Sequence, residues 1–285
     1  MNILFNNQVV PRDSVSIDME DRGYQFGDGI YEVVAIHNGE LFEWDAHLER
    51  FLRSAKEISL TLPEQFEQLK DNIYQLIAEN QVEQGYVYFQ LTRGTSPRMH
   101  TFPEPEVSSV LTGLVKKVDQ QPVTFMKAIT TEDIRWLRVD IKSLNLLPNC
   151  MAKQKAAEAG AAEAIFLRDG LVTEASSSNV FGVKDGVLYT HPISNLILNG
   201  ITRQVVLRLA EKLDYRLVEE AFTKEELMAM NEVFITNTGV NVCPIVEIDH
   251  FLIGDGACGP ITASLMAAFN ELIQLKEKMG IYSQK

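Results

Sequence analysis

Lys142 is a residue whose surroundings suggest chemistry. It lies in the stretch DIKSLNLLPN (140–149), ahead of three leucines. Most lysines are solvated surface charges, so a single lysine does not establish a reactive amine. A neutral amine in apolar company can, however, act as a nucleophile or as a general acid–base. Other polar residues of the chain have to support one interpretation or the other.

A glutamate ahead of a turn rich in hydroxyl groups is the second candidate. The stretch EASSSNVF (174–181) begins with Glu174 and continues with three serines and Asn179. Such residues form turns readily, and their side chains can also supply hydrogen bonds around a polar ligand. Taken alone, the stretch leaves both interpretations open.

Two further stretches could bind anions. GITRQVVLRLAEKL (200–213) has apolar residues at helical spacing, and the N–H groups at a helix start suit a phosphate. Taken alone, an ordinary capped helix is the simpler interpretation. LTRGTSPRMH (91–100) places Arg93, Arg98 and His100 on a loop that could capture a carboxylate. A solvated loop is the alternative there.

Together these four features match the needs of pyridoxal phosphate. That cofactor requires an amine for a Schiff base, a carboxylate beside its pyridine nitrogen and a site for its phosphate. Its amino acid substrates require a cation that binds their carboxylate. The sequence therefore favours a cofactor-dependent enzyme over a set of unrelated surface features.

The sequence lacks the motifs of several other classes of enzyme and binding site. It contains neither a P-loop nor a GxSxG motif, and no Cys/His spacing typical of zinc, so no metal site is expected. Residues 254–259 match GxGxxG, but too few residues follow for the helix, strand and acidic residue of a dinucleotide-binding fold. We expect a hairpin turn there that leads into a helix.

Composition excludes several classes of partner. The chain has 285 residues and a formal net charge of −13, which disfavours binding to nucleic acid or to an anionic membrane. It shows neither a signal peptide nor an apolar run long enough to span a bilayer. The three cysteines form no CxxC pair, which favours a reducing compartment and hence a cytoplasmic location.

Hydrophobic periodicity predicts an α+β first part and a β-rich second part with packed helices. In the first part we expect a hairpin at 30–43, helices at 46–58 (with Asp45 as N-cap) and 64–80, and strands at 86–94 and 107–117. In the second part we expect Asp-Gly turns within 166–174 and 180–190, and helices at 201–214, 223–230 and 261–278. The polar stretch 116–124 is the expected boundary, which gives domains 1–118 and 119–285.

Five stretches closely resemble the bacterial D-amino acid (D-alanine) aminotransferases. They are EDRGYQFGDGIYEVV (20–34), TRGTSPRMH (92–100), EDIRWLRVDIKSLNLL (132–147), TEASSSNVFG (173–182) and LNGITR (198–203). The resemblance runs over nearly the whole chain. It implies a pyridoxal phosphate enzyme of fold type IV (α+β/α/β), with a smaller N-terminal α/β domain, a larger β-rich pseudo-barrel domain and the cofactor at their interface.

The resemblance also implies a role for each matching residue. Lys142 resembles the Schiff-base lysine, and Glu174 resembles the partner of the pyridine nitrogen. The other cofactor-binding residues that it implies are Arg50, Ser177, Leu198, Ile201, Thr202 and Thr238. The residues that it implies for the substrate α-carboxylate are Tyr31, Arg98 and His100. In this family the Arg-x-His loop reaches in from the neighbouring subunit, so a homodimer with shared active sites is implied.

The reaction implied is transamination between a D-amino acid, with D-alanine favoured, and 2-oxoglutarate, which gives a 2-oxo acid such as pyruvate and D-glutamate. One alternative is another enzyme of the same fold, an L-branched-chain aminotransferase or an aminodeoxychorismate lyase, although the pattern Arg98-Met99-His100 favours the D-type. A non-catalytic anion-binding α/β protein would explain the helix start and the arginines. It would not explain why Lys142 and Glu174 occur together with them.

Overall fold

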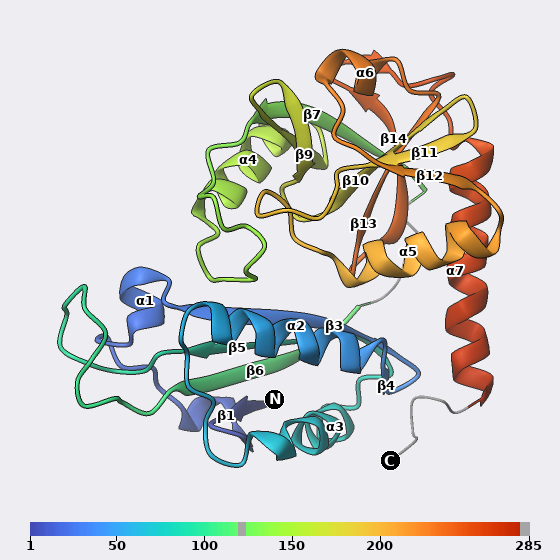
Figure 1. Ribbon diagram of the computed structural model, residues 1–285. Helices are drawn as coiled ribbons and strands as arrows, with labels where there is room; N and C mark the ends of the chain where they lie inside the picture. Colours follow the sequence, from blue (N-terminus) through green and yellow to red (C-terminus); the bar gives the residue numbers. More distant parts are fainter. Residues whose placement is uncertain (119–123, 280–285) are drawn as a thin grey trace. The chain divides into compact units, whose positions relative to one another are not determined.

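The computed structural model describes residues 1–118 and 124–279 and divides into two compact units (Figure 1). Unit 1 consists of Met1–Gln120, Ile141–Asn145 and Lys276–Lys285, and unit 2 consists of Gln121–Asp140 and Leu146–Leu275. The short segment that carries Lys142 thus belongs to unit 1, although residues of unit 2 flank it on both sides. The boundary predicted between 118 and 119 falls at residues 119–123, which lie outside the described residues.

Unit 1 is built on a six-stranded antiparallel sheet with the order β2-β1-β6-β5-β3-β4. Its strands are β1 (Asn2–Phe5), β2 (Gln8–Pro11), β3 (Gly29–His37), β4 (Glu40–Leu41), β5 (Gln84–Thr92) and β6 (Val110–Lys117). The predicted hairpin is confirmed. Asn38 and Gly39 both have positive φ (56° and 79°), as the tight turn between β3 and β4 requires.

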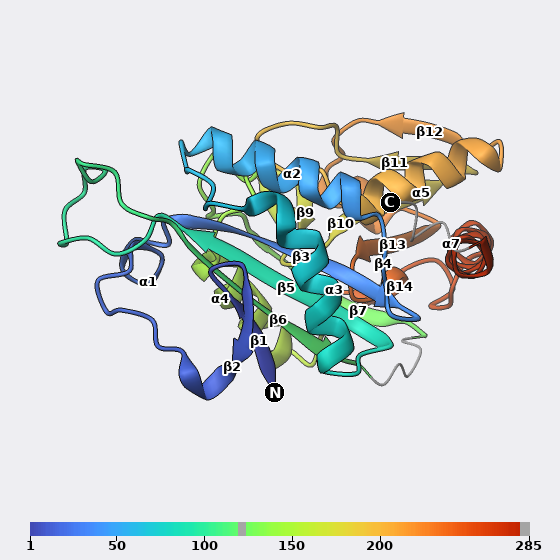
Figure 2. The same ribbon diagram turned by 90° about the horizontal axis from the view of Figure 1, so that it is seen from below.

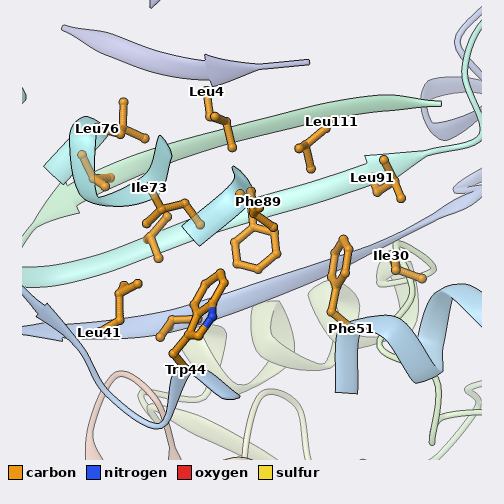
Figure 3. Close-up of a cluster of buried hydrophobic side chains, with 14 of the residues drawn as sticks. Leu4, Ile30, Leu41, Trp44, Phe51, Ile73, Leu76, Phe89, Leu91 and Leu111 are labelled. Carbon is orange, nitrogen blue, oxygen red and sulfur yellow. The ribbon is translucent and has the colours of Figure 1, made fainter. Parts of the chain in front are cut away.

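Helices α2 (Trp44–Glu57) and α3 (Leu69–Glu79) pack on one face of this sheet (Figure 2). Figure 3 shows their side chains meeting those of the strands, with Phe51 against Phe89 at a ring separation of 5.1 Å. Both helices were predicted, but Asp45 is not the N-cap. The N-cap is Glu43, and Asp45 lies in the first turn, where the helix dipole favours a carboxylate. The short helix α1 (Arg22–Phe26) precedes β3 and was not predicted.

Unit 2 is built on a nine-stranded mixed sheet with the order β12-β11-β10-β13-β14-β7-β8-β9, and β15 pairs with β14. The strands are β7 (Met126–Glu132), β8 (Glu163–Arg168), β9 (Leu171–Ala175), β10 (Asn179–Lys184), β11 (Val187–Thr190), β12 (Arg216–Glu219), β13 (Glu232–Asn237), β14 (Asn241–Ile248) and β15 (Phe251–Leu252). The predicted Asp-Gly turns join β8 to β9 and β10 to β11. The GxGxxG stretch leads into a long helix, as predicted, but it connects β15 to that helix and is not a hairpin turn.

The helices that begin in unit 2, among the residues that the structure describes, are α4 (Leu147–Glu158), α5 (Ile201–Lys212), α6 (Lys224–Met228) and α7 (Pro260–Met279). The predictions for α5, α6 and α7 are confirmed, whereas α4 was missed. Only Ala152 and Ala156 of α4 are buried, against Ala164 and Phe166 of β8. Alanines give no clear hydrophobic period, so the sequence pattern does not reveal this helix.

Within the described part of the chain, none of the helices has the length and apolar character needed to cross a membrane. The cysteines Cys150, Cys243 and Cys258 are all free thiols. Among residues 1–118 and 124–279, no cluster of three or more His, Cys, Asp or Glu side chains is arranged to hold a metal ion.

Candidate active site

The main chain of Lys142 is fixed to unit 1 at several points. Its carbonyl accepts a hydrogen bond from the N–H of Tyr31 at 3.0 Å, and its own N–H donates to the hydroxyl of Ser54 on α2 at 3.3 Å. On the next residue, Ser143 forms a β-bridge with Ile30. The segment therefore adds to the edge of β3, and the backbone of the lysine is held independently of its side chain.

The amine of Lys142 lies over an aromatic ring. Its Nζ is 4.2 Å from the ring centroid of Tyr31, and the side chain is half-buried. Nζ forms no hydrogen bond or ion pair with any residue that the structure describes. A cation–π contact of this kind contributes only about 0.5–1 kcal/mol. The amine is therefore available for covalent chemistry.

Arg50 is oriented by a buried carboxylate on the same strand as Tyr31. Glu32 is 0% exposed, and it accepts hydrogen bonds from Arg50 Nε at 2.7 Å and from Arg50 Nη2 at 2.9 Å. The second oxygen also lies 2.7 Å from Nδ1 of His47. An arginine has five N–H donors, and its planar fork is fixed by a bidentate partner. Glu32 thus sets the orientation of the guanidinium that is expected to bind phosphate.

The charges in this group are set by burial and by Arg50. Burial acts to raise the pKa of Glu32, but the charge of Arg50 and the hydrogen bonds of Arg50 and His47 outweigh it, and the pKa lies well below its ordinary value. Burial lowers the pKa of His47 below its ordinary value despite Glu32. Since His47 is then neutral at neutral pH, Arg50 supplies the charge that keeps Glu32 ionised.

We expect Glu32→Gln to lower the free energy of unfolding at neutral pH by about 3 kcal/mol, because it leaves the Arg50 charge uncompensated. A carboxylate with a lowered folded-state pKa contributes stability above its unfolded pKa and loses it as the pH falls. The difference between wild type and variant should therefore shrink below about pH 4. Urea unfolding at a series of pH values measures it. A difference that stays constant into acid would contradict the prediction.

Arg98 and His100 lie on the β5–β6 loop (residues 93–109), and both are exposed. The ring of Phe26 lies 5.7 Å from the ring of His100, and the guanidinium of Arg98 lies 5.1 Å from the centroid of Phe26. Within the described chain, neither Arg98 nor His100 forms a hydrogen bond, ion pair or ring contact with Tyr31 or Lys142. Tyr31 and Lys142 are thus brought together, whereas Arg98 and His100 each contact Phe26.

In unit 2, Glu174 lies on β9 and accepts three hydrogen bonds. Oε1 accepts from Arg135 Nη1 at 2.5 Å, and Oε2 accepts from Asn179 Nδ2 and from the N–H of Leu198, each at 3.0 Å. Burial raises the pKa of Glu174 above its ordinary value, although Arg135 and the N–H of Leu198 oppose it. A carboxylate has about four acceptor positions, so one on Oε1 remains for a further donor. A protonated ring nitrogen is a donor of the required kind.

Arg135 is in turn oriented by Asp133. Its Nε and Nη2 donate to the two oxygens of Asp133, both at 2.8 Å, and Arg168 adds an ion pair to the same carboxylate at 3.0 Å. Burial acts to raise the pKa of Asp133, but Arg135 and Arg168 outweigh it and hold the pKa below its ordinary value. The remaining nitrogen, Nη1, is therefore directed to Glu174.

The start of α5 is joined to Glu174 through Asn179. Ile201 and Thr202 are the first two residues of the helix, both buried, and Gly200 provides no side-chain cap. The Nδ2 group of Asn179 also donates to the carbonyl of Leu198 at 2.8 Å. A Cβ on Gly200 would lie 2.2 Å from Oδ1 of Asn179, so the close approach requires glycine. The first N–H groups of a helix have no intrahelical acceptor and suit a phosphate.

The serine turn is held by a different carboxylate. The hydroxyls of residues 176–178 all donate to Glu163 of β8, and that of Ser177 lies 3.0 Å from Oε2. Asn237 donates to Ser178 Oγ at 2.8 Å and accepts from the two N–H groups that follow Thr238. Glu163 and Asn237 thus determine the positions of Ser177 and Thr238, which lie in neighbouring turns.

The charged partners Glu32 and Arg135 were not predicted from the sequence. A signal existed for Glu32, since an acidic residue inside the apolar strand GIYEVVAIH has to be paired when it is buried. Arg135 follows Asp133 by two residues, a spacing that many unrelated sequences contain. Its contact with Glu174 joins residues 39 positions apart and is visible only in three dimensions.

Comparisons with known proteins identify the family of this chain. A family model described as amino-transferase class IV matches residues 29–248. A D-alanine aminotransferase of Bacillus licheniformis is 48% identical over 276 residues, which cover 96% of this chain and 97% of that protein.

Two solved structures share the fold. The branched-chain amino acid aminotransferase of Escherichia coli superimposes with a TM-score of 0.89 at 23% identity and covers 95% of this chain and 94% of that one. A branched-chain aminotransferase of the archaeon Thermoproteus uzoniensis, solved with norvaline, gives 0.86 at 28% identity and covers 98% of this chain and 96% of that one. The expectation of fold type IV is confirmed. The chain belongs to the class IV aminotransferase family.

Proposed function

We propose that this aminotransferase transfers the amino group of a D-amino acid, with D-alanine favoured, to 2-oxoglutarate by means of pyridoxal phosphate. The products are a 2-oxo acid, such as pyruvate, and D-glutamate. The similarity to a D-alanine aminotransferase over nearly the full length of both chains supports the choice of substrate. The observation that carries the proposal is the amine of Lys142, which lies over Tyr31 without a hydrogen-bonding or charged partner in the described chain.

The residues in both units suit this cofactor. Lys142 offers the amine, Glu174 offers an acceptor position, and Arg50 and the start of α5 offer donors for a phosphate. When bound, pyridoxal phosphate supplies a carbonyl carbon that takes up the amino group and a ring that accepts the electron pair left at the substrate Cα. We propose that the two sets of residues serve one molecule of the cofactor.

Lys142 would attach the cofactor and, once the substrate amine has displaced it, move a proton to and from the substrate Cα. Glu174 would keep the ring nitrogen protonated by accepting its hydrogen bond. Arg50, Ile201, Thr202 and Thr238 would hold the phosphate so that one face of the ring remains toward Lys142. Ser177 and Leu198 would contact the cofactor beside its ring.

Tyr31, Arg98 and His100 are proposed to bind the substrate α-carboxylate. The site of this carboxylate decides which enantiomer directs its Cα–H toward Lys142, so stereochemistry follows from the position of these three residues. We propose that the chain forms a homodimer. In it, Arg98 and His100 of one copy bind the substrate in the active site of the other copy. The exposure of both loop residues agrees with this role. The three free thiols agree with a cytoplasmic location.

A spectral titration tests the proposal. D-Alanine is added to the purified protein with bound pyridoxal phosphate, and L-alanine or L-leucine is added to separate samples. We expect D-alanine alone to convert the absorbance of the bound cofactor into that of the pyridoxamine form. A response to L-amino acids alone would favour a branched-chain aminotransferase and would contradict the carboxylate-binding assignment. A protein that retains no pyridoxal phosphate would contradict the assignment of the cofactor.

A further inference from the structure

Arg22 of α1 binds the backbone on both sides of His100. Its guanidinium Nη1 donates to the carbonyl of Met99 at 2.7 Å and to the carbonyl of Thr101 at 3.2 Å. Arg22 is only 3% exposed, whereas His100 is exposed. A buried, rigid side chain thus fixes the backbone of an exposed residue that is expected to bind substrate.

Asp28 orients Arg22. Its Oδ2 accepts from Nε of Arg22 and from Nε of Arg93, both at 2.8 Å, and its Oδ1 accepts from Nη2 of Arg93 at 3.0 Å. Burial acts to raise the pKa of Asp28, but the two arginines outweigh it and hold the pKa below its ordinary value. Asp28 is therefore ionised at neutral pH, and one carboxylate binds both arginines.

Phe26 at the end of α1 contacts both side chains of the Arg-x-His pattern. Its ring lies edge-on to that of His100 at 5.7 Å, while the guanidinium of Arg98 lies 5.1 Å from its centroid. The guanidinium of Arg22 also lies 4.9 Å from this ring. The side chains of Arg22 and Phe26 thus contact the backbone and the side chains of the same short stretch of the loop.

The base of the β5–β6 loop is attached to the same segment. The N–H of Arg22 donates to the carbonyl of Gly94 at 2.9 Å, and the N–H of Arg93 donates to the carbonyl of Asp28 at 3.1 Å. Thr92 Oγ1 donates to Asp21, the N-cap of α1, at 2.8 Å. Figure 2 shows α1 beside this loop. Residues 21–28 therefore hold the base of the loop by hydrogen bonds.

We propose that Arg22 and Phe26 are positioning residues of the carboxylate-binding loop, and that Asp28 acts by orienting Arg22. This inference rests on the proposed function, because it takes Arg98 and His100 as ligands of the substrate carboxylate. The side chains of an exposed loop bind a small anion well only when they are held in the correct positions. A misplacement of about 1 Å can reduce the rate of a reaction by about 10²-fold. Arg22 and Phe26 restrict such a misplacement.

The test compares Arg22→Met, Arg22→Lys and Phe26→Leu with the wild type. Lysine retains the charge but lacks the planar fork that binds Asp28 and two carbonyls at once. For Arg22→Met we expect the KM for D-alanine to rise about 10-fold or more, with a smaller change in kcat and unchanged retention of pyridoxal phosphate. Arg22→Lys should recover only part of the loss. Arg12→Met, at an exposed site, is the matched control and should leave both constants unchanged.

Two further measurements separate positioning from general damage to the fold. In a double-mutant cycle, Arg22→Met should have little additional effect on the KM once His100 has been replaced by alanine, because the two residues act through the same contact. Hydrogen exchange of residues 93–109, measured without substrate, should speed up in Arg22→Met and in Phe26→Leu but not in the control. This second measurement does not depend on activity.

The outcomes distinguish the two hypotheses. Additive effects of Arg22→Met and His100→Ala, or unchanged exchange of the loop, would overturn the positioning role while leaving the transamination intact. A wild type that does not react with D-alanine would contradict the proposed function, and the exchange experiment would still decide whether Arg22 and Phe26 hold the loop. If Arg22→Met does not fold, Phe26→Leu provides the same comparison, because it retains apolar volume and loses only the ring contacts.

Discussion

Replacement of Lys142 by alanine is expected to reduce turnover by at least about 10³-fold, because the variant lacks the amine that is proposed to attach the cofactor and to act as the base for the substrate Cα. The fold should remain intact. The backbone of Lys142 is held by Tyr31 and Ser54, and its side chain contributes a single ring contact. We therefore expect the free energy of unfolding to change by less than about 1 kcal/mol. Steady-state kinetics and urea unfolding measure the two effects.

A mixed dimer provides the control. If Arg98 and His100 act on the second subunit, a dimer of one Lys142→Ala chain and one His100→Ala chain contains one site in which both residues are native. Each variant alone should be inactive or weak, and refolding them together should restore part of the activity. Full activity of Lys142→Ala on its own would contradict the assignment of the lysine. A mixture no more active than its components would contradict the shared site.

The chemistry of the site was more accessible from the sequence than the contacts that support it. Neither Lys142 nor Glu174 is decisive alone; their expected roles come from their occurrence together with the anion-binding stretches and from the resemblance to a known family. Arg135 and Asn179, which donate to Glu174, are separated from it by 39 and 5 residues and follow no periodic pattern. Such contacts are set by the packing of strands, which a single sequence does not specify.

The division of the chain into two units was also only partly predictable from the sequence. Hydrophobic periodicity predicted α2 and α3 in the first part and α5, α6 and α7 in the second, but it missed α1 and α4. It did not predict that Ile141–Asn145 joins unit 1. That assignment depends on a short edge pairing, Ile30 with Ser143, and on backbone hydrogen bonds to β3. Backbone hydrogen bonds require no particular side chain, so the sequence contains no signal for them.

Glu174→Gln is expected to reduce kcat by about 10²–10³-fold, since a neutral amide cannot keep a pyridine nitrogen protonated as a carboxylate does. The substitution is nearly isosteric, so a lost contact volume does not explain the effect. Stability should fall as well. The amide must direct its NH₂ group either at Arg135 or at Asn179 and Leu198, all of which are donors. We expect a loss of about 2–3 kcal/mol in the free energy of unfolding, because a buried donor remains unpaired.

The control for Glu174→Gln is the same substitution at Glu232 in the same unit. Glu232 is also buried, and its carboxylate accepts hydrogen bonds from the N–H groups of Ile261 and Thr262 and from the hydroxyl of Thr262 at the start of α7. Glu232→Gln should lower stability by a similar amount and leave kcat unchanged. If both variants lose stability and only Glu174→Gln loses turnover, the effect belongs to the chemistry of Glu174. If Glu174→Gln retains the wild-type kcat, a different group must interact with the ring nitrogen, and the acceptor position on Glu174 has no catalytic role.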